Sequence, residues 1–321
     1  MVTPFLSNSF CKMFHIMYTF LSLISVIYSA IINFQIFNLF ITYIREMYYL
    51  VNYQRRKNAL KKLKEINSNR QNYYIIHYAC DDFKRGDTIT SIAIKHLNDG
   101  ETTSFSLEKT AANKNIEIHE IKENLPFIEQ HMLKEFFHFI KERPEKYWIH
   151  WNMNDDNFGF RALENRALNL SIKDDIFSII DDRKINLSSL LVDLYGYEYI
   201  DHPRLKNLME LNNINPPDFY PGYSTNSKTI TEPILFHEGK YKEIRLSCLR
   251  KVYIFNKFVD LAIDKQLKTK TNLWKVFGTN FSGIYNIYNE QPWSQPVSFF
   301  LGMIVNKFFD KFLNWILSMF F

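Results

Sequence analysis

One stretch of the chain gathers side chains that could do chemistry. Trp148–Leu163, "WIHWNMNDDNFGFRAL", places one histidine, three asparagines and two aspartates between an apolar strand-like run and an apolar helix-like run. Histidine and carboxylate side chains are common general bases and metal ligands. The stretch therefore has the composition of an active site, or of the remains of one. Its candidate catalytic residues are His150, Asp155 and Asp156, and Asn152 is a candidate binding residue.

Further candidates lie elsewhere in the chain. If the domain is an enzyme, the candidate catalytic residues are His77, Asp81, His150, Asp155, Asp156 and His202. The three histidines fall at predicted strand ends or helix starts and could share one rim of a sheet. There they could bind one transition metal together with Asp155, Asp156 or Asp201.

A structural role competes with each of these interpretations. His150 and Asn152 could instead cap the following helix and bond the neighbouring backbone, and this is the favoured alternative, so no metal site is preferred. Cys80 could be a nucleophile near His77, but a buried structural cysteine is commoner. Arg204 could meet an anionic ligand or face solvent. The candidate binding residues are Asn152, Arg204, Arg250 and Lys251.

The elements that must position these residues alternate between strand and helix patterns, which predicts an α/β fold. The apolar, β-rich runs predict strands, with "NDGE" as a hairpin turn after the second: 72–80, 88–97, 102–107 and 147–151. Amphipathic runs predict helices at 125–143, 158–170, 185–196 and 241–263, and a further helix capped by Asp201 with Pro203 in its first turn.

Composition narrows the classes of protein. The 321 residues are 46% hydrophobic, enough for a substantial core in one or two domains. The three cysteines, Cys11, Cys80 and Cys248, form neither a disulfide framework nor a zinc-binding pair, which favours reduced thiols in the cytoplasm. No Walker loop, GxSxG or HExxH motif is present.

The N-terminal region predicts a membrane anchor. Residues 13–44 contain no Lys, Arg, Asp or Glu, and a spanning helix needs about 20 residues. We expect one transmembrane helix within residues 14–44; a buried core helix is the alternative. Ser22, Ser25, Ser29 and Asn33 share one side of it, which would suit self-association into a homo-oligomer, although isolated serines are also tolerated in such helices.

The charges beside this segment predict its orientation. Residues 45–70 hold eight basic and two acidic side chains, whereas the chain after residue 70 holds 30 basic and 32 acidic ones. The positive-inside rule therefore places the main domain in the cytoplasm. We expect the basic segment to contact anionic lipid; nucleic-acid binding and a solvated linker are the alternatives. The main domain has no basic excess with which to track a nucleic-acid backbone.

The C-terminal region has a similar but weaker pattern. Residues 297–321 are apolar except for one polar stripe, which suits a helix in the membrane interface or one packed on the domain. The predicted organisation is a tail (1–13), a transmembrane helix (14–44), a basic juxtamembrane helix or linker (45–71), an α/β domain (72–290) and a hinge with an amphipathic helix (291–321).

The order of the predicted elements resembles the ribonuclease-H-like superfamily, and within it the proofreading-type (DEDD) 3′–5′ exonucleases. The resemblance covers roughly residues 72–263. "ITSIAIKHLNDGETTSFSL" is similar to the second and third strands, "FIEQHMLKEFFHFI" to the next helix, and "WIHWNMNDDNFGFRAL" to the turn and helix start. "LSSLLVDLYG" and "HPRLKNLMELNNI" are similar to later helices. It implies a mixed sheet flanked by helices.

The resemblance also implies four carboxylates that hold two divalent ions, Mg²⁺ or Mn²⁺. At the corresponding positions this chain has His77 and Ala79 in place of Asp-x-Glu, Gly159 in place of the second aspartate, and Ser247 near the position of the last acid. Asp81, Asp82, Asp155 or Asp156 would serve as displaced ligands if the registers differ by a few residues.

Three functions remain open at this point. The first is a membrane-anchored cytoplasmic binding or sensor module on a degenerate exonuclease-like domain, without a cofactor. Its ligand would be a nucleic-acid end, a nucleotide or a protein, and its architecture would suit a bacterial stress-response or phage-defence component. The second is an active, metal-dependent nuclease tethered to the membrane. The third is a structural membrane-associated protein with no ligand.

Overall fold

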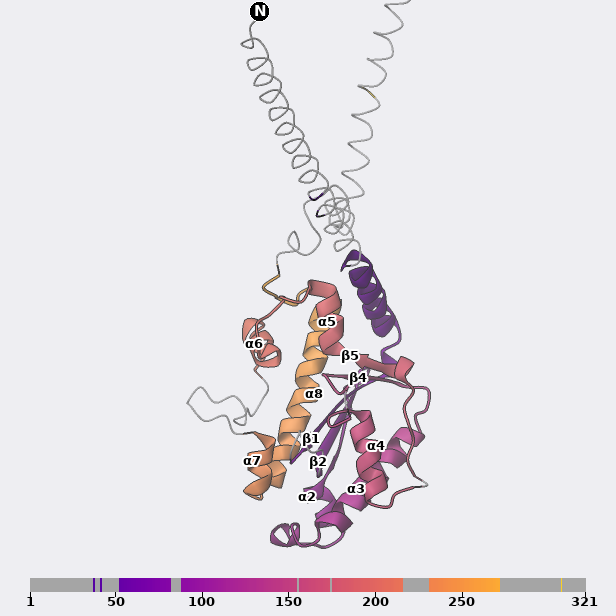
Figure 1. The fold of residues 1–321 in the computed structure, drawn as a ribbon, viewed down its shortest axis with the longest axis vertical. Coiled ribbons are helices and arrows are strands. Elements are labelled where there is room, and N and C mark those ends of the chain that lie inside the picture. Colours follow the sequence, from indigo (N-terminus) through magenta and orange to yellow (C-terminus); the bar gives the residue numbers. More distant parts are fainter. Residues whose placement is uncertain are drawn as a thin grey trace, which may run out of the picture. The chain divides into compact units, whose positions relative to one another are not determined.

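A computed structural model describes residues 52–81, 88–154, 156–173, 175–215 and 231–271, together with Phe37, Ile41 and Lys307 (Figure 1). Residues 54–276 form one compact unit. Residues 1–53 and 277–321 belong to a second unit, of which the structure describes only Phe37, Ile41, Asn52, Tyr53 and Lys307.

The compact unit is built on a five-stranded mixed sheet with the strand order β3-β2-β1-β4-β5. The strands are β1 (Tyr73–Cys80), β2 (Ile89–His96), β3 (Thr102–Ser106), β4 (Tyr147–His150) and β5 (Lys184–Asn186). β2 pairs antiparallel with β1 and with β3. β4 pairs parallel with β1, and β5 pairs parallel with β4. The sequence prediction of an α/β fold is therefore confirmed.

Helix α8 (Tyr241–Ile263) packs on one face of the sheet, against β1, β2 and β3. Its buried side chains recur every three or four residues and include Ile244, Cys248, Val252, Phe255 and Val259. This spacing gives the helix an apolar stripe that faces the strands. In Figure 1, α8 crosses the sheet on the same side as the short helices α6 (Arg204–Leu211) and α7 (Glu232–His237).

The opposite face is covered by α3 (Leu125–Lys141) and α4 (Phe160–Asn169). Tyr74 of β1 makes an edge contact with Phe139 of α3. Glu129 of α3 is fully buried, and the Arg166 guanidinium of α4 donates to both of its carboxylate oxygens. Burial raises the pKa of the Glu129 carboxyl, although Arg166 opposes this shift. This ion pair joins the two helices under the sheet.

A helix over residues 52–68 leads into the sheet. Ala59, Leu63 and Ile66 bury one side of it, and Glu65 accepts from the Tyr73 hydroxyl at the start of β1. Its basic residues Arg55, Lys57, Lys61 and Lys64 are exposed. The described part of the predicted juxtamembrane segment is thus packed against the domain by its apolar side.

Several predicted elements need correction. The predicted helix 185–196 begins at residue 187 as α5 (Leu187–Tyr195), because Lys184–Asn186 pair with β4 as a fifth strand. A three-residue strand leaves too short a pattern to be recognised in a sequence. Asp201 does not cap α6: Pro203 is the N-cap, and the Asp201 carboxylate accepts from Lys270. Helices α2 (Leu107–Asn113) and α7 were not predicted.

Within the described residues, no helix is both long and apolar enough to cross a membrane. The predicted transmembrane helix (14–44) lies outside them except for Phe37 and Ile41, which are helical. The predicted interface helix (297–321) also lies outside them, except for Lys307.

Candidate functional site

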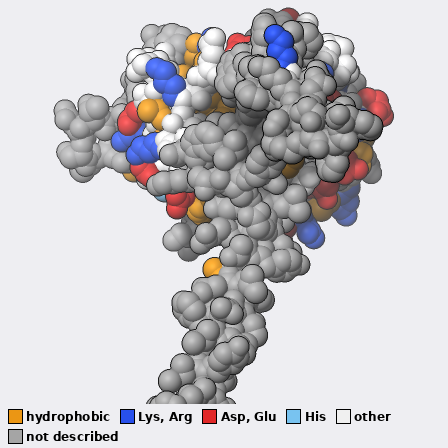
Figure 2. All heavy atoms as spheres, turned by 90° about the horizontal axis from the view of Figure 1, so that it is seen from above, with side chains coloured by type: hydrophobic (Ala, Val, Ile, Leu, Met, Phe, Trp, Pro, Cys, Tyr) orange, Lys and Arg blue, Asp and Glu red, His pale blue; other side chains and the backbone are white. Residues whose placement is uncertain are grey.

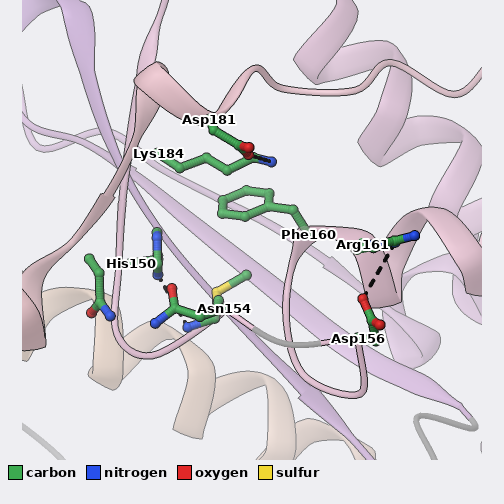
Figure 3. A pocket seen from close by; sticks show the side chains of 9 residues that line it. His150, Asn154, Asp156, Phe160, Arg161, Asp181 and Lys184 are labelled. Atoms are coloured by element: carbon green, nitrogen blue, oxygen red, sulfur yellow. Dashed lines mark hydrogen bonds and ion pairs between the residues drawn. The ribbon is translucent and has the colours of Figure 1, made fainter.

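A pocket of about 470 Å³ lies over β4 and β5, beside the start of α4 (Figure 3). Small-molecule pockets typically have volumes of roughly 300–1,000 Å³. It is lined by residues of both strands, of the loop after β4, of the turn before β5 and of the start of α4: His150, Met153, Asn154, Asp156, Phe160, Arg161, Asp181, Lys184 and Asn186. The stretch that first suggested chemistry therefore supplies most of its wall.

His150 forms the buried part of this pocket. Its side chain is 2% exposed, and the Phe160 ring meets it edge-on with centroids 5.5 Å apart. Nδ1 accepts a hydrogen bond from the Met153 amide at 3.2 Å, so the neutral ring carries its proton on Nε2. Burial, with a smaller contribution from the Lys184 charge, lowers the pKa of His150 to about 4. The ring is therefore neutral at pH 7.

The rim of the pocket is charged but balanced. Lys184 pairs with Asp181 at 2.8 Å, and Arg161 faces Asp156 at 3.4 Å. Figure 3 shows these two pairs on opposite sides of Phe160. Since two cations meet two carboxylates and His150 is neutral, the lining carries no net charge. It offers both donors and acceptors to a polar ligand.

The turn after β4 is fixed by asparagines. Asn152 adopts a left-handed φ of +53°, which asparagine tolerates better than most residues. Its amide N–H donates to Asn186 Oδ1 at 3.2 Å, and the same oxygen caps α5 by accepting from the Ser188 amide at 3.1 Å. Asn152 is thus a turn residue, and His150 bonds the neighbouring backbone. Neither residue caps α4, whose N-cap is Gly159.

A second polar group lies on the other face of the sheet, between β1, α7 and α8. Glu232 of α7 accepts from the Lys251 ammonium and, at 2.7 Å, from the Ser247 hydroxyl, both on α8. The Lys251 and Glu232 side chains are only 15% and 11% exposed. Burial acts to raise the pKa of Glu232, but the Lys251 charge and these hydrogen bonds lower it to about 2. We call Glu232, Ser247, Lys251 and His77 the buried cluster.

His77 completes the buried cluster from β1. Its side chain is 6% exposed, and neither ring nitrogen has a hydrogen-bond partner among the described residues. The ring packs edge-on against Phe255 of α8, with centroids 5.8 Å apart. Burial and the nearby Lys251 charge lower its pKa well below the usual value, and Glu232 opposes them. His77 is therefore a neutral, unpaired imidazole beside an ion pair.

The structure separates the three histidines that were predicted to share one rim. Alternate residues of a strand point to opposite faces. His77 meets α8 on one face, whereas His150 meets Phe160 of α4 on the other. His202 lies before α6, at a cis peptide bond to Pro203. Cys80 is fully buried at the end of β1, where the pairing with β2 is irregular.

Two further predicted site residues, Asp81 and Arg204, make hydrogen bonds to the protein backbone. Asp81 Oδ1 accepts from the Thr88 amide at 2.8 Å, across the ends of β1 and β2. Arg204 lies over the Tyr197 and Tyr199 rings and donates to the Tyr197 carbonyl at 3.1 Å. Arg250 is half-buried on α8. Asp82 and Asp155 lie outside the described residues.

The donor set does not fit a two-metal carboxylate site. In the buried cluster the only carboxylate is already neutralised by an ammonium group, and the pocket's carboxylates face Arg161 and Lys184. Across the part of the chain that the structure describes, no three His, Cys, Asp or Glu side chains gather in a way that could hold a metal ion.

Several residues of these two regions were missed in the sequence. Glu232, Asp181, Lys184 and Asn186 lie far along the chain from the stretch that suggested chemistry. Only Asn186 carried a local signal, as an asparagine two residues before Ser188 at a helix start.

Comparison of this chain with protein-family models, curated proteins and solved structures found no match.

Proposed function

We propose that this chain is a membrane-anchored, cytoplasmic binding or sensor module built on a catalytically degenerate, exonuclease-like domain of the ribonuclease-H-like class. The element order supports this class: a strand, a hairpin, a helix, a strand, a helix and a final long helix across the sheet. The anchor rests on residues 14–44 and on the exposed basic side chains of the helix that follows.

One observation carries the loss of catalysis. The resemblance expects carboxylates at positions 77, 79, 159 and 247. His77 and Ser247 both belong to the buried cluster, and Phe158, next to Gly159, lies 6.1 Å from the His77 ring. Among the described residues of the buried cluster, the chain supplies an ammonium group, Lys251, rather than a set of ligands for divalent cations. A two-metal mechanism needs several carboxylates to neutralise its ions.

Gly159 itself has a packing role. Its amide donates to the Tyr78 hydroxyl at 2.8 Å, and Phe158 packs on the Tyr78 ring with centroids 4.6 Å apart. Tyr78 is fully buried. The start of α4 is thereby tied to β1 by an aromatic side chain, where the resemblance expects a metal ligand.

The chain after residue 70 has 30 basic and 32 acidic side chains, and this balance argues against a groove that tracks a long nucleic-acid backbone. On the coloured parts of the face in Figure 2, basic and acidic side chains are interspersed. A nucleic-acid backbone is usually bound by a surface of one sign. The balanced pocket suits a base, a sugar or a polar protein side chain. We therefore propose a nucleic-acid end, a nucleotide or a protein as the ligand.

The test uses the full-length chain purified in detergent. It is incubated with labelled single-stranded DNA and RNA and Mg²⁺ or Mn²⁺, beside an active exonuclease as a positive control. We expect no cleavage, together with binding that weakens as salt rises. Metal-dependent cleavage that disappears when Asp155 and Asp156 are both changed to Ala would instead establish the alternative, an active membrane-tethered nuclease.

A further inference from the structure

The buried cluster has the composition of an anion site. Lys251 and Ser247 donate to the same oxygen, Glu232 Oε1. An ammonium and a hydroxyl that converge on one oxygen are typical donors to carboxylate and phosphate groups. The site is rigidly framed, because both donors lie on α8, the long helix that packs across the sheet.

The carboxylate of Glu232 leaves part of this site unused. His77 packs on Phe255, one turn of α8 after Lys251, and feels the charges of Lys251 and Glu232. Neither of its ring nitrogens has a partner among the described residues, and leaving a buried polar group unpaired costs about 1–3 kcal/mol. A carboxylate held through one oxygen reaches the two donors of α8 but not the imidazole. A phosphate group has three strong acceptor oxygens. It could therefore accept from Lys251, Ser247 and a His77 N–H together.

We propose that Lys251, Ser247 and His77 form a binding site for a terminal phosphate group, and that Glu232 of α7 fills this site as a built-in competitor. This inference rests on the proposed function, because it names the ligand chemistry of the binding module. A terminal phosphomonoester suits the site better than an internal phosphodiester, since the cluster is nearly closed to solvent and only a chain end can reach in.

The exchange of ligands requires little of the fold. His77 lies on β1, and Lys251 and Ser247 lie on α8, all within the packed core. Only α7 carries the competitor. It is a six-residue helix, held by the buried Leu235 and Phe236 and by Lys122, which donates to the His237 carbonyl at 2.9 Å. The Glu232 side chain can therefore leave while the phosphate-binding residues stay in place.

The test compares phosphate binding to the full-length wild-type chain and to Glu232→Gln, which keeps the size of the side chain and removes its charge. Isothermal titration uses inorganic phosphate, a nucleoside monophosphate, and one oligonucleotide with either a 5′-phosphate or a 5′-hydroxyl end. We expect Glu232→Gln to bind the phosphate-bearing ligands at least about tenfold more tightly than wild type, which corresponds to about 1.4 kcal/mol. The 5′-hydroxyl oligonucleotide should show no such gain.

Two further variants in the Glu232→Gln background locate the site. Adding Lys251→Met should abolish the gain, and adding Ser247→Ala should reduce it severalfold. A folded Glu232→Gln protein that binds phosphate no more tightly than wild type overturns the proposal, and so does a gain that survives Lys251→Met. If Glu232→Gln does not fold, the ring-nitrogen signals of His77 in wild type, followed by NMR during a phosphate titration, decide: a shift supports the site and no shift overturns it.

The outcomes separate this inference from the proposed function. Metal-dependent nuclease activity of the wild-type chain would refute the proposed function, whatever the result at Glu232. Nucleic-acid binding that depends on the pocket residues and is indifferent to Glu232 and Lys251 would leave the binding module standing and refute the phosphate site.

Discussion

The two polar regions of this domain lie on opposite faces of one sheet and handle charge in opposite ways. At the pocket over β4 and β5, the Arg161 and Asp156 side chains are 74% and 70% exposed and face each other at 3.4 Å. In the buried cluster, Lys251 and Glu232 are almost enclosed and joined directly. Exposed pairs contribute little to stability because water and salt screen them. Removing one partner of a buried pair is strongly destabilising, because it leaves the other charge buried without compensation.

The difference teaches where function and stability are coupled. Substitution of the exposed charged residues of the pocket should change the free energy of unfolding little, so the ligand preference of the pocket can change without loss of the fold. In the buried cluster any ligand must compete with an internal ion pair that also holds α7 on α8.

The largest effect is expected at Lys251. Changing Lys251→Met leaves the Glu232 carboxylate buried without its cation, which should lower the free energy of unfolding by about 3–5 kcal/mol. Urea denaturation of the full-length chain, followed by circular dichroism, measures the loss. The double variant Lys251→Met/Glu232→Leu should recover most of it, because it removes both charges together. A loss that persists in the double variant would mean that the packing of Lys251 matters more than its charge.

The next effect is a loss of stability in acid that depends on His150. Its pKa is about 4 in the folded state and about 6.5 when unfolded, so the unfolded state binds more protons between these values. Above pH 6.5 the residue adds no pH dependence. As the pH falls from 6.5 to 4, His150 should cost up to about 3 kcal/mol of stability. Unfolding of wild type and His150→Gln across this range gives the measurement.

His77 shifts in the same direction and serves as the matched control on the other face. His77→Gln should also make the free energy of unfolding depend less on pH below pH 6.5. If His150→Gln leaves the slope unchanged while His77→Gln abolishes it, the pocket histidine is not the buried, neutral group described above.

A smaller effect is expected at Asn186. This residue caps α5 and also accepts from the Asn152 amide. Asn186→Ala should lower the free energy of unfolding by about 1–2 kcal/mol, the range of a lost N-cap. Asn186→Asp keeps the accepting oxygen and should retain most of the stability. Equal losses in both variants would show that the amide N–H groups of Asn186, rather than its Oδ1, hold the turn.

The smallest effect on stability is expected at Arg161. Because the side chain is exposed and its pair with Asp156 is long, Arg161→Ala should change the free energy of unfolding by no more than about 0.5 kcal/mol. A polar ligand bound in the pocket should nevertheless dissociate more readily from this variant, which titration of single-stranded oligonucleotides would show. A large loss of stability would contradict the view of this rim as structurally independent.

The sequence predicted the long, strongly patterned elements well. The apolar runs at 72–80 and 88–97 became β1 and β2, and the amphipathic run at 241–263 became α8 with the same bounds. Such elements bury a regular face, so their periodicity is visible without the fold. β5 and α7 were not predicted, because three and six residues are too few to show a hydrophobic periodicity.

The candidate site was predicted only in part. His150 and Asp156 were named and do line the pocket, but Arg161, which faces Asp156, and the pair of Lys184 and Asp181 were not. His77 and Lys251 were named for separate roles, and nothing local indicated that Glu232 would join them. That cluster depends on α7 packing against α8 and β1, a tertiary contact with no signature in the spacing of residues.

Strand β1 contributes side chains to both faces of the sheet. His77 points toward α8, and its neighbour Tyr78 points toward Phe158 and Gly159 at the start of α4. Because side chains alternate, the deletion of one residue upstream in β1 would move both side chains to the opposite faces and place a tyrosine beside Lys251. The strand thus constrains how this domain can evolve: substitutions can tune either face alone, but a change of length in β1 alters both at once.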